Sequence, residues 1–110
     1  MDIQPIETRY RGYRFRSRLE ARWAVFFDSL KVAWQYESDG VVVADVNSDR
    51  KWKWLPDFYL PATKTRVEVK GDWASVPLDY WNMILNATDW GGPFADGAQS
   101  VLLLGNIPDP

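Results

Sequence analysis

The sequence predicts a single α/β domain, and three observations indicate it. Residues 18 to about 32 have the apolar spacing of a helix, and residues 55–71 alternate polar and apolar side chains as strands do. A second helical pattern at residues 77–89 is followed by an apolar run at residues 101–104 that is typical of a strand. The expected order is therefore helix, two or three antiparallel strands, helix and strand, with a mixed sheet flanked by helices.

Composition supports one globular domain, residues 1–110, and excludes several kinds of enzyme. The chain is 46% hydrophobic and 25% charged, as folded domains are. It has no histidine and no cysteine, so it cannot build a catalytic triad, a cysteine nucleophile or a thiolate or imidazole zinc site. Any catalysis must use Asp, Glu, Lys, Tyr or Ser. No apolar run reaches transmembrane length and no signal-peptide pattern is present, so we expect no membrane association and a cytoplasmic location.

Arginine is concentrated in an N-terminal arm, from about residue 7 to residue 18. Six arginines and two glutamates between Glu7 and Arg22 give this stretch a net charge of +4, so the remainder of the chain carries −6. Aromatic residues alternate with the arginines, a pattern that suits nucleic acid because guanidinium groups grip phosphates and rings stack on bases. A strand whose aromatics pack on the domain, with its arginines in water, would look the same. The candidate phosphate contacts are Arg9, Arg11, Arg14, Arg16 and Arg18.

The first helix begins at a capping motif, because Ser17 and Glu20 have the S-x-x-E spacing of a capping box. Glu20 also lies inside the apolar arc of this helix, where an acid is costly unless it is capped, paired or bound to metal. Capping and metal binding compete for the same carboxylate, and the sequence leaves both open. The arc is expected to contain Leu19, Trp23, Ala24, Phe26, Phe27 and Leu30.

Short strands are expected next, at residues 34–37 and 41–44, with turn signals at residues 38–40 and 47–49. The following strand is expected to begin as early as Lys51. Alternation would then place Lys51 and Lys53 on the face of Asp57, as further nucleic-acid contacts, and Trp52 and Trp54 in the core with Phe58. Pro56 indicates an edge position or a bulge in this strand, and a bulge would break the alternation before it.

The hairpin at residues 55–70 carries the most informative pattern. With residues 61–64 as its loop, Leu60 pairs with Thr65, and Asp57 then lies directly across from Glu68. Lys70 shares the face of Glu68, so two carboxylates and an ammonium converge. Like charges across a sheet are destabilising, and a hard cation such as Mg²⁺ would relieve them. An ordinary solvated face, on which a lysine pairs with two acids, is the alternative.

The second helix is expected to begin near Pro77 and to end before Gly91. The apolar strand at residues 101–104 fits a position buried on both faces. The helix face expected in the core contains Leu78, Trp81, Ile84, Leu85 and Thr88.

With Pro56 and Asp57 on one strand and Glu68, Val69 and Lys70 on the next, the chain resembles the PD-(D/E)XK nuclease superfamily from about residue 14 to residue 105. The segment FRSRLEARWA further resembles small phage and bacterial members. This resemblance implies the restriction-endonuclease-like fold, with an αβββαβ core. The second helix departs from the pattern, because it lacks the Gln or Lys that completes the site in some branches.

The resemblance also implies roles for individual residues. Asp57 and Glu68 would bind Mg²⁺ or Mn²⁺ together with the backbone carbonyl of Val69. Lys70 would be the catalytic lysine, and Glu20 would be the acid that the first helix contributes to the catalytic and metal site.

The expected function is therefore a metal-dependent endonuclease, with DNA favoured over RNA as its partner, in a bacterium or a phage-infected host cell. A homodimer would supply the two sites that cutting both strands requires. Two other functions stay open. One is an inactive nuclease fold that binds nucleic acid or a protein partner, and the other is a structural interaction domain built on the seven tryptophans.

Overall fold

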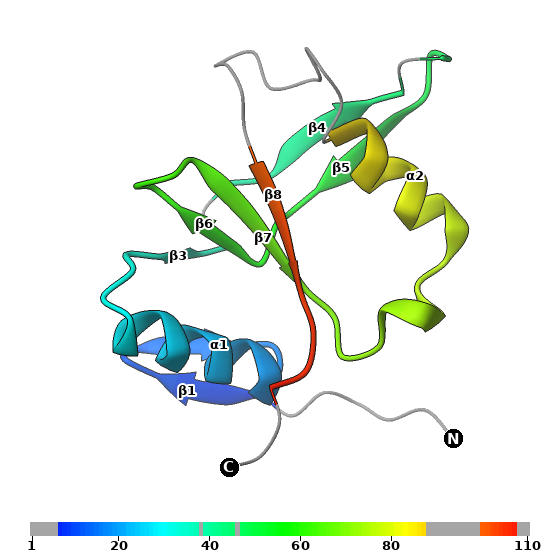
Figure 1. The fold of residues 1–110 in the computed structure, drawn as a ribbon. Helices are drawn as coiled ribbons and strands as arrows, with labels where there is room; N and C mark the ends of the chain where they lie inside the picture. The colour runs from blue at the N-terminus through cyan, green and yellow to red at the C-terminus, as the bar shows by residue number, and fades with distance from the viewer. Residues whose placement is uncertain (1–6, 38, 46, 88–99, 108–110) are drawn as a thin grey trace.

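A mixed β-sheet lies at the centre of the molecule (Figure 1). The computed structural model describes residues 7–37, 39–45, 47–87 and 100–107. Within these ranges the strand order is β3-β6-β7-β8, with β7 and β8 parallel and the other pairs antiparallel. The α/β class with a mixed sheet is therefore confirmed. The strands are β3 (Gln35–Tyr36), β6 (Phe58–Leu60), β7 (Thr65–Val69) and β8 (Ser100–Leu104).

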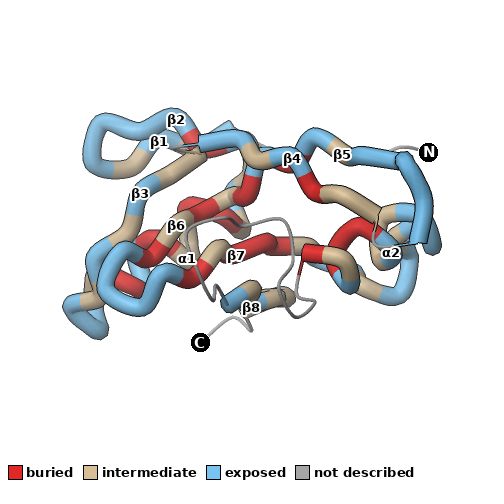
Figure 2. The backbone as a smooth tube through the Cα atoms, turned by 90° about the horizontal axis from the view of Figure 1, so that it is seen from above, coloured by how far each residue is buried: buried red, intermediate tan, exposed pale blue. Residues whose placement is uncertain are grey.

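The register of β6 and β7 is the one that the sequence predicted. Leu60 pairs with Thr65, and Phe58 pairs with Val67, across a turn at residues 61–64. The next positions beyond the last pair are Asp57 and Glu68. The apolar face of this hairpin packs on helix α1, and Figure 2 shows buried positions along β6 and β7 through the middle of the molecule.

Helix α1 (Arg18–Ser29) begins where the sequence predicted but ends earlier than residue 32. The side-chain oxygen of Ser17 caps it by accepting a hydrogen bond from the N–H of Glu20 at 3.1 Å. At the other end Lys31 has a φ of +58°, and the N–H of Val32 returns to the carbonyl of Phe27 at 2.9 Å. This is the Schellman pattern, which ends the helix because the left-handed residue breaks the regular hydrogen-bond ladder.

The face that α1 buries differs from the predicted arc. Phe26 is 43% exposed and Leu30 is exposed as well, so their expected place in the core was wrong. The helix turns its two small residues, Ala21 and Ala24, toward the sheet, and small side chains allow a close approach of helix and sheet. The buried positions of the helix are Glu20, Ala21, Ala24 and Phe27.

The N-terminal arm is a β-hairpin of β1 (Thr8–Tyr10) and β2 (Tyr13–Phe15). Its turn, Arg11 and Gly12, has φ angles of +51° and +83°, which a two-residue hairpin turn of the primed type requires at both positions. Phe15 is fully buried, with its ring centroid 4.4 Å from that of Tyr36. The hairpin is therefore part of the core, as the packed alternative for the arm predicted.

A second layer is formed by a hairpin of β4 (Val41–Ala44) and β5 (Lys51–Trp54) together with helix α2 (Leu78–Ala87). Strands β5 and β6 belong to different sheets, with residues 55–57 between them. The expected continuous strand from Lys51 was therefore wrong, because β5 ends at Trp54 and the chain bends at Asp57. This layer has its own hydrophobic cluster, separate from that of Phe58, made of Val43, Trp54, Met83, Ile84 and Ala87.

Helix α2 follows a short 3-10 helix, η1 (Trp73–Ser75), and buries a narrower face than predicted. Leu78 is 77% exposed and Leu85 is 64% exposed, so both were wrongly placed in the core, whereas Ile84 is buried as expected. The predicted helix end at Asp89 and the expected core residue Thr88 lie outside the described residues.

Neither described helix combines the length and apolar content that a membrane crossing needs.

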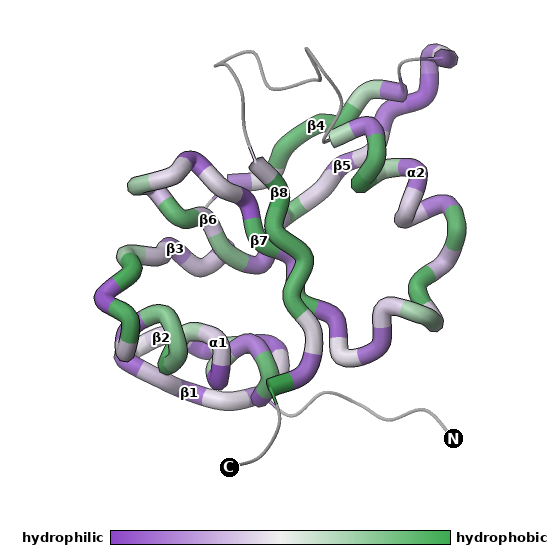
Figure 3. Tube along the Cα trace, viewed as in Figure 1, coloured by the Kyte–Doolittle hydropathy of each residue, from purple (hydrophilic) through white to green (hydrophobic). Residues whose placement is uncertain are grey.

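Strand β8 is the hydrophobic strand that the sequence predicted, and Figure 3 shows it as a strongly hydrophobic stretch. Its expected burial on both faces was wrong, because Leu102 is exposed. Two tryptophans fix the end of this strand. The indole N–H of Trp73 donates to the carbonyl of Leu104 at 2.9 Å, and that of Trp23 donates to the carbonyl of Gly105 at 2.8 Å.

We predict that Phe15→Ala destabilises the protein by about 3–4 kcal/mol, because it removes a fully buried ring. The matched control, Phe26→Ala, removes the same ring from an exposed helix position and should cost less than about 1 kcal/mol. Urea unfolding of both variants measures the difference. If Phe26→Ala lowers the free energy of unfolding as much as Phe15→Ala does, Phe26 is buried in solution and α1 turns a different face to the core.

Candidate active site

Asp57 lies at the bend before β6 and is held from two sides. Its Oδ2 accepts a hydrogen bond from the backbone N–H of Val69 at 2.7 Å, and its backbone carbonyl accepts one from the N–H of Glu37 at 3.0 Å. The first bond attaches the Asp57 side chain to the end of β7. The carboxyl group is thereby fixed beside that of Glu68, with which it interacts.

Glu68 is an acid in the interior of the protein, only 3% exposed. Its neighbours on β7, Val67 and Val69, belong to the cluster around α1, so Glu68 faces the opposite side of the sheet. There its Oε2 accepts a hydrogen bond from the indole N–H of Trp54 at 3.0 Å. The alternative of an ordinary solvated face is therefore not the environment of Glu68.

Glu20 reaches the same acids from helix α1 and is 6% exposed. The hydroxyl of Ser17 donates to its Oε1 and the hydroxyl of Tyr36 donates to its Oε2, each at 2.8 Å. Half of the capping box is formed, the bond from the Glu20 N–H to the Ser17 oxygen. The other half is replaced, because the Glu20 carboxylate accepts its hydrogen bond from the Ser17 hydroxyl. This carboxylate turns inward and contacts Asp57.

Burial is the main cause of the altered protonation of these acids. Burial, the contact with Glu68 and the negative charge of Glu68 raise the pKa of Asp57 to about 8, against the opposing effect of the Val69 N–H. Burial and then the charge of Asp57 raise the pKa of Glu20 to about 7. Burial also raises the pKa of Tyr36, so its hydroxyl keeps the proton that it donates to Glu20.

Lys70 follows β7 directly and continues its pairing, since its N–H donates to the carbonyl of Leu104 at 3.0 Å. Its ammonium lies 5.1 Å from the ring centroid of Tyr80 on α2, in a cation–π contact. Among the described residues it forms no ion pair with Asp57 or Glu68. The structure thus brings the three acids together and holds the Lys70 ammonium against an aromatic ring of α2.

The acids form a chain of contacts, from Glu20 to Asp57 and from Asp57 to Glu68. No group of three or more Asp, Glu, His or Cys side chains in the described part of the chain is arranged to hold a metal ion. The pair of Asp57 and Glu68 is nevertheless a set of oxygen donors, and Mg²⁺ commonly takes one or two carboxylates from a protein. Chemically, the pair can hold either a proton or a hard cation.

The arginines of the N-terminal hairpin are exposed, and two of them lie directly opposite each other. Arg9 pairs with Arg14 across the strands, on the face that points away from buried Phe15. Arg11 forms an ion pair with Asp28 at 2.9 Å and Arg16 forms one with Glu37 at 2.9 Å, while Arg18 begins helix α1. Like charges directly across a strand pair are unfavourable, and here the carboxylate of Glu7, 3.7 Å from Nε of Arg14, offsets part of the repulsion.

Lys51 and Lys53 do not extend the face of Asp57, as the sequence had suggested. Both are exposed on β5, and they alternate with Trp52 and Trp54, which face the second cluster. Since β5 belongs to a separate hairpin, its lysines point away from the layer that contains Glu68.

Sequence reasoning missed three residues that hold the site: Tyr36, Trp54 and Tyr80. They contact Glu20, Glu68 and Lys70 in turn. A general signal was present, because buried Trp and Tyr side chains need a partner for their polar atoms. That signal does not say which residue the partner is.

No protein-family model, curated protein or solved structure matches the chain.

We predict that, in metal-free buffer, the free energy of unfolding falls as the pH rises from about 5 to 8. Asp57 keeps its proton up to about pH 8 when folded and loses it near its ordinary value, 3.8, when unfolded, so folding takes up a proton in this window. Asp57→Asn retains an oxygen for the Val69 N–H and adds an amide donor for Glu68. It should therefore raise stability at pH 8 by about 1–3 kcal/mol and flatten the pH dependence.

Asp49→Asn is the matched control, since it removes a carboxylate at an exposed position. Urea unfolding at several pH values in EDTA gives the comparison. If Asp57→Asn follows the wild-type curve, the Asp57 carboxyl group is not buried beside Glu68 in solution.

Proposed function

We propose that the chain is a metal-dependent nuclease that hydrolyses phosphodiester bonds in DNA. The observation that carries the proposal is the pair of adjacent carboxyl groups of half-buried Asp57 and buried Glu68, with buried Glu20 in contact with the first. Acids in contact inside a protein lower its stability, and their presence is explained when the site binds a cation. Binding of a hard cation is the purpose that their oxygen donors fit best.

The finer fold assignment is part of the proposal. Helix α1, strands β3, β6 and β7, helix α2 and strand β8 follow one another in the αβββαβ order of the restriction-endonuclease-like core, with the β4–β5 hairpin inserted after β3. The parallel pairing of β7 and β8 and the placement of Asp57 and Glu68 on neighbouring segments support this assignment. The resemblance to the PD-(D/E)XK superfamily rests on the same residues.

In this proposal Asp57 and Glu68 hold Mg²⁺ or Mn²⁺, with the backbone carbonyl of Val69 as a further ligand and Glu20 beside them. The ion, when bound, supplies charge that polarises the phosphate and lowers the pKa of a water. Ser17 and Tyr36 direct their hydroxyls at Glu20, which fixes its carboxylate toward Asp57.

Lys70 is the cation that the chain itself provides at this site. Lys70 lies two positions after Glu68, directly after β7, and its ammonium lies 5.1 Å from the ring centroid of Tyr80. An ammonium at this place stabilises negative charge that develops on the phosphate, or orients the attacking water.

The N-terminal hairpin provides a surface for the DNA backbone. Arg9 and Arg14 extend side by side from its outer face. A hollow of about 260 Å³ is lined by Arg11, Tyr13, Asp28, Ala33 and Trp34, and Arg11 is ion-paired with Asp28 at its edge. Guanidinium groups beside aromatic rings are typical of surfaces that bind nucleic acid.

A second candidate function is a nuclease fold that binds nucleic acid without cutting it. The outward pair Arg9 and Arg14 supports this as much as it supports a nuclease. Binding alone would weaken with salt and would not depend on Mg²⁺. The three acids, which binding to a polyanion does not require, favour the nuclease.

We predict that the purified protein cleaves end-labelled DNA in Mg²⁺ and that EDTA stops the reaction. Lys70→Ala should lower the rate by about 100-fold or more, since it removes charge stabilisation at the phosphate. Asp57→Asn and Glu68→Gln should abolish cleavage because they remove the proposed ligands. Lys64→Asn, which removes a lysine from the exposed β6–β7 turn, is the control and should cleave as the wild type does. Cleavage that survives both EDTA and Lys70→Ala would overturn the proposal.

We also predict that replacing Arg9 and Arg14 together by alanine weakens DNA binding uniformly across sequences. Each lost phosphate contact should reduce the slope of log affinity against log salt by about 0.9. Fluorescence anisotropy in EDTA measures binding without cleavage, and Lys64→Asn again serves as the control. An unchanged slope would place the DNA on another surface.

A further inference from the structure

The indole of Trp54 connects two layers of the protein at the candidate site. It comes from β5, in the hairpin outside the central sheet, yet its N–H donates to Oε2 of Glu68 on β7 at 3.0 Å. The two residues are 14 positions apart in the chain, and both are buried. This bond is a direct polar link from the second layer to a proposed metal ligand.

The position of Trp54 is fixed by its own surroundings. It is 4% exposed and pairs with Val41 across the β4–β5 hairpin. Its ring belongs to the cluster with Val43 on β4 and with Met83 and Ile84 on α2. A ring packed in this way from two elements has little freedom to rotate, so its N–H points in one direction.

The chemistry of the indole suits a holding role. Trp N–H is a donor that neither titrates nor accepts, so it presents the same group to Glu68 at every working pH. A carboxylate that accepts a fixed hydrogen bond loses rotational freedom, and its remaining lone pairs keep a defined direction. In metal sites, groups that hold the ligands in this way typically contribute 10–100-fold to metal affinity.

We propose that Trp54 is a positioning residue that orients the Glu68 carboxylate for binding a divalent metal ion. The inference rests on the proposed nuclease function, and it adds the β4–β5 hairpin to the parts of the chain that determine metal affinity. Trp54 does not touch the metal or the substrate in this role, because it acts through Glu68.

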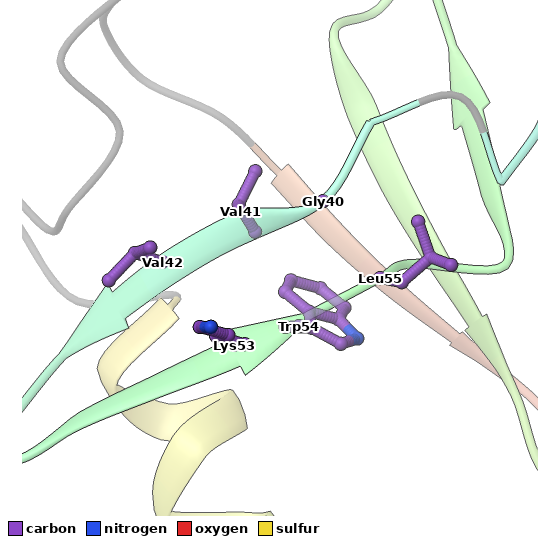
Figure 4. Close-up of a pocket in the computed structure, with 6 residues that line it drawn as sticks. All are labelled: Gly40, Val41, Val42, Lys53, Trp54 and Leu55. Atoms are coloured by element: carbon purple, nitrogen blue, oxygen red, sulfur yellow. The ribbon is translucent and has the colours of Figure 1, made fainter.

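The structure offers a well-matched set of variants. Trp54→Phe keeps an aromatic ring in the cluster and removes the N–H. Trp54 also borders a hollow of about 350 Å³, so neighbouring side chains have room to adjust to the smaller ring (Figure 4). The hollow is lined by Gly40, Val41, Val42, Lys53, Trp54 and Leu55.

Trp52→Phe is the control, because Trp52 lies on the same face of the same strand. Its N–H reaches Asp79 on α2 at 3.4 Å, not an acid of the candidate site. A change common to both variants therefore reports on the hairpin in general. A change confined to Trp54→Phe reports on the bond to Glu68.

The experiment measures Mn²⁺ binding by the electron paramagnetic resonance signal of the free ion, with full-length protein at fixed pH. Each variant is first shown to be folded by circular dichroism and by its urea unfolding curve. We expect Trp54→Phe to bind Mn²⁺ about 10-fold more weakly than the wild type, and Trp52→Phe to stay within about 2-fold of it.

Should Trp54→Phe fail to fold, benzothienylalanine at position 54 replaces the N–H by sulfur in a ring of nearly the same size. The same 10-fold loss is expected from this isostere. Wild-type affinity in a folded Trp54 variant would overturn the positioning role while leaving the nuclease proposal intact. A wild type that binds no Mn²⁺, or binds it equally well after Asp57→Asn, would overturn both.

Discussion

The hydrogen bond from the backbone N–H of Val69 to the carboxyl group of Asp57 is the constraint on which the candidate site depends. Asp57 lies where the chain bends between two sheets, so no regular strand pairing holds its side chain in place. The bond to Val69, together with the backbone bond from Glu37, fixes this bend against the central sheet. The fixed bend places Asp57 next to Glu68, and Glu20 of helix α1 contacts Asp57.

Each of these acids accepts a hydrogen bond from a neutral donor within the described part of the chain. Tyr36 and Ser17 donate to Glu20, Trp54 donates to Glu68 and the Val69 N–H donates to Asp57. Neutral donors orient a carboxylate without cancelling its charge, so the carboxylate can still bind a proton or a metal ion. An arginine or lysine in the same place would have neutralised the carboxylate permanently. Such an arrangement suits a site that exchanges a proton for a metal ion.

The local geometry of the site could be predicted from the sequence, and its surroundings could not. A four-residue loop and strict alternation determine the register of β6 and β7, which is why the places of Asp57 and Glu68 followed from counting. Helical periodicity, by contrast, does not say which of several apolar neighbours faces the sheet. In α1 the small side chains of Ala21 and Ala24 decided this at the expense of Phe26.

Distance along the chain explains the other misses. Pro56 indicated a bulge, but the change of sheet at this point depends on how β5 pairs with β4. The donors that hold the acids come from separate elements, and nothing in the spacing of Trp54 or Tyr36 specifies their partners. The same holds for Lys70, whose ammonium contacts a ring on α2 and no acid among the described residues. Contacts of this kind are set by tertiary packing.

The attachment of β8 has a consequence for how the molecule assembles. This strand pairs in parallel with β7, and Trp23 reaches Gly105 over 82 positions of sequence, so the contact closes a very large loop. Contacts between such distant segments are slow to form, which makes docking of β8 a late event in folding. The indoles of Trp23 and Trp73 each donate to the backbone at the end of this strand, so both lose a hydrogen-bond partner whenever β8 is undocked.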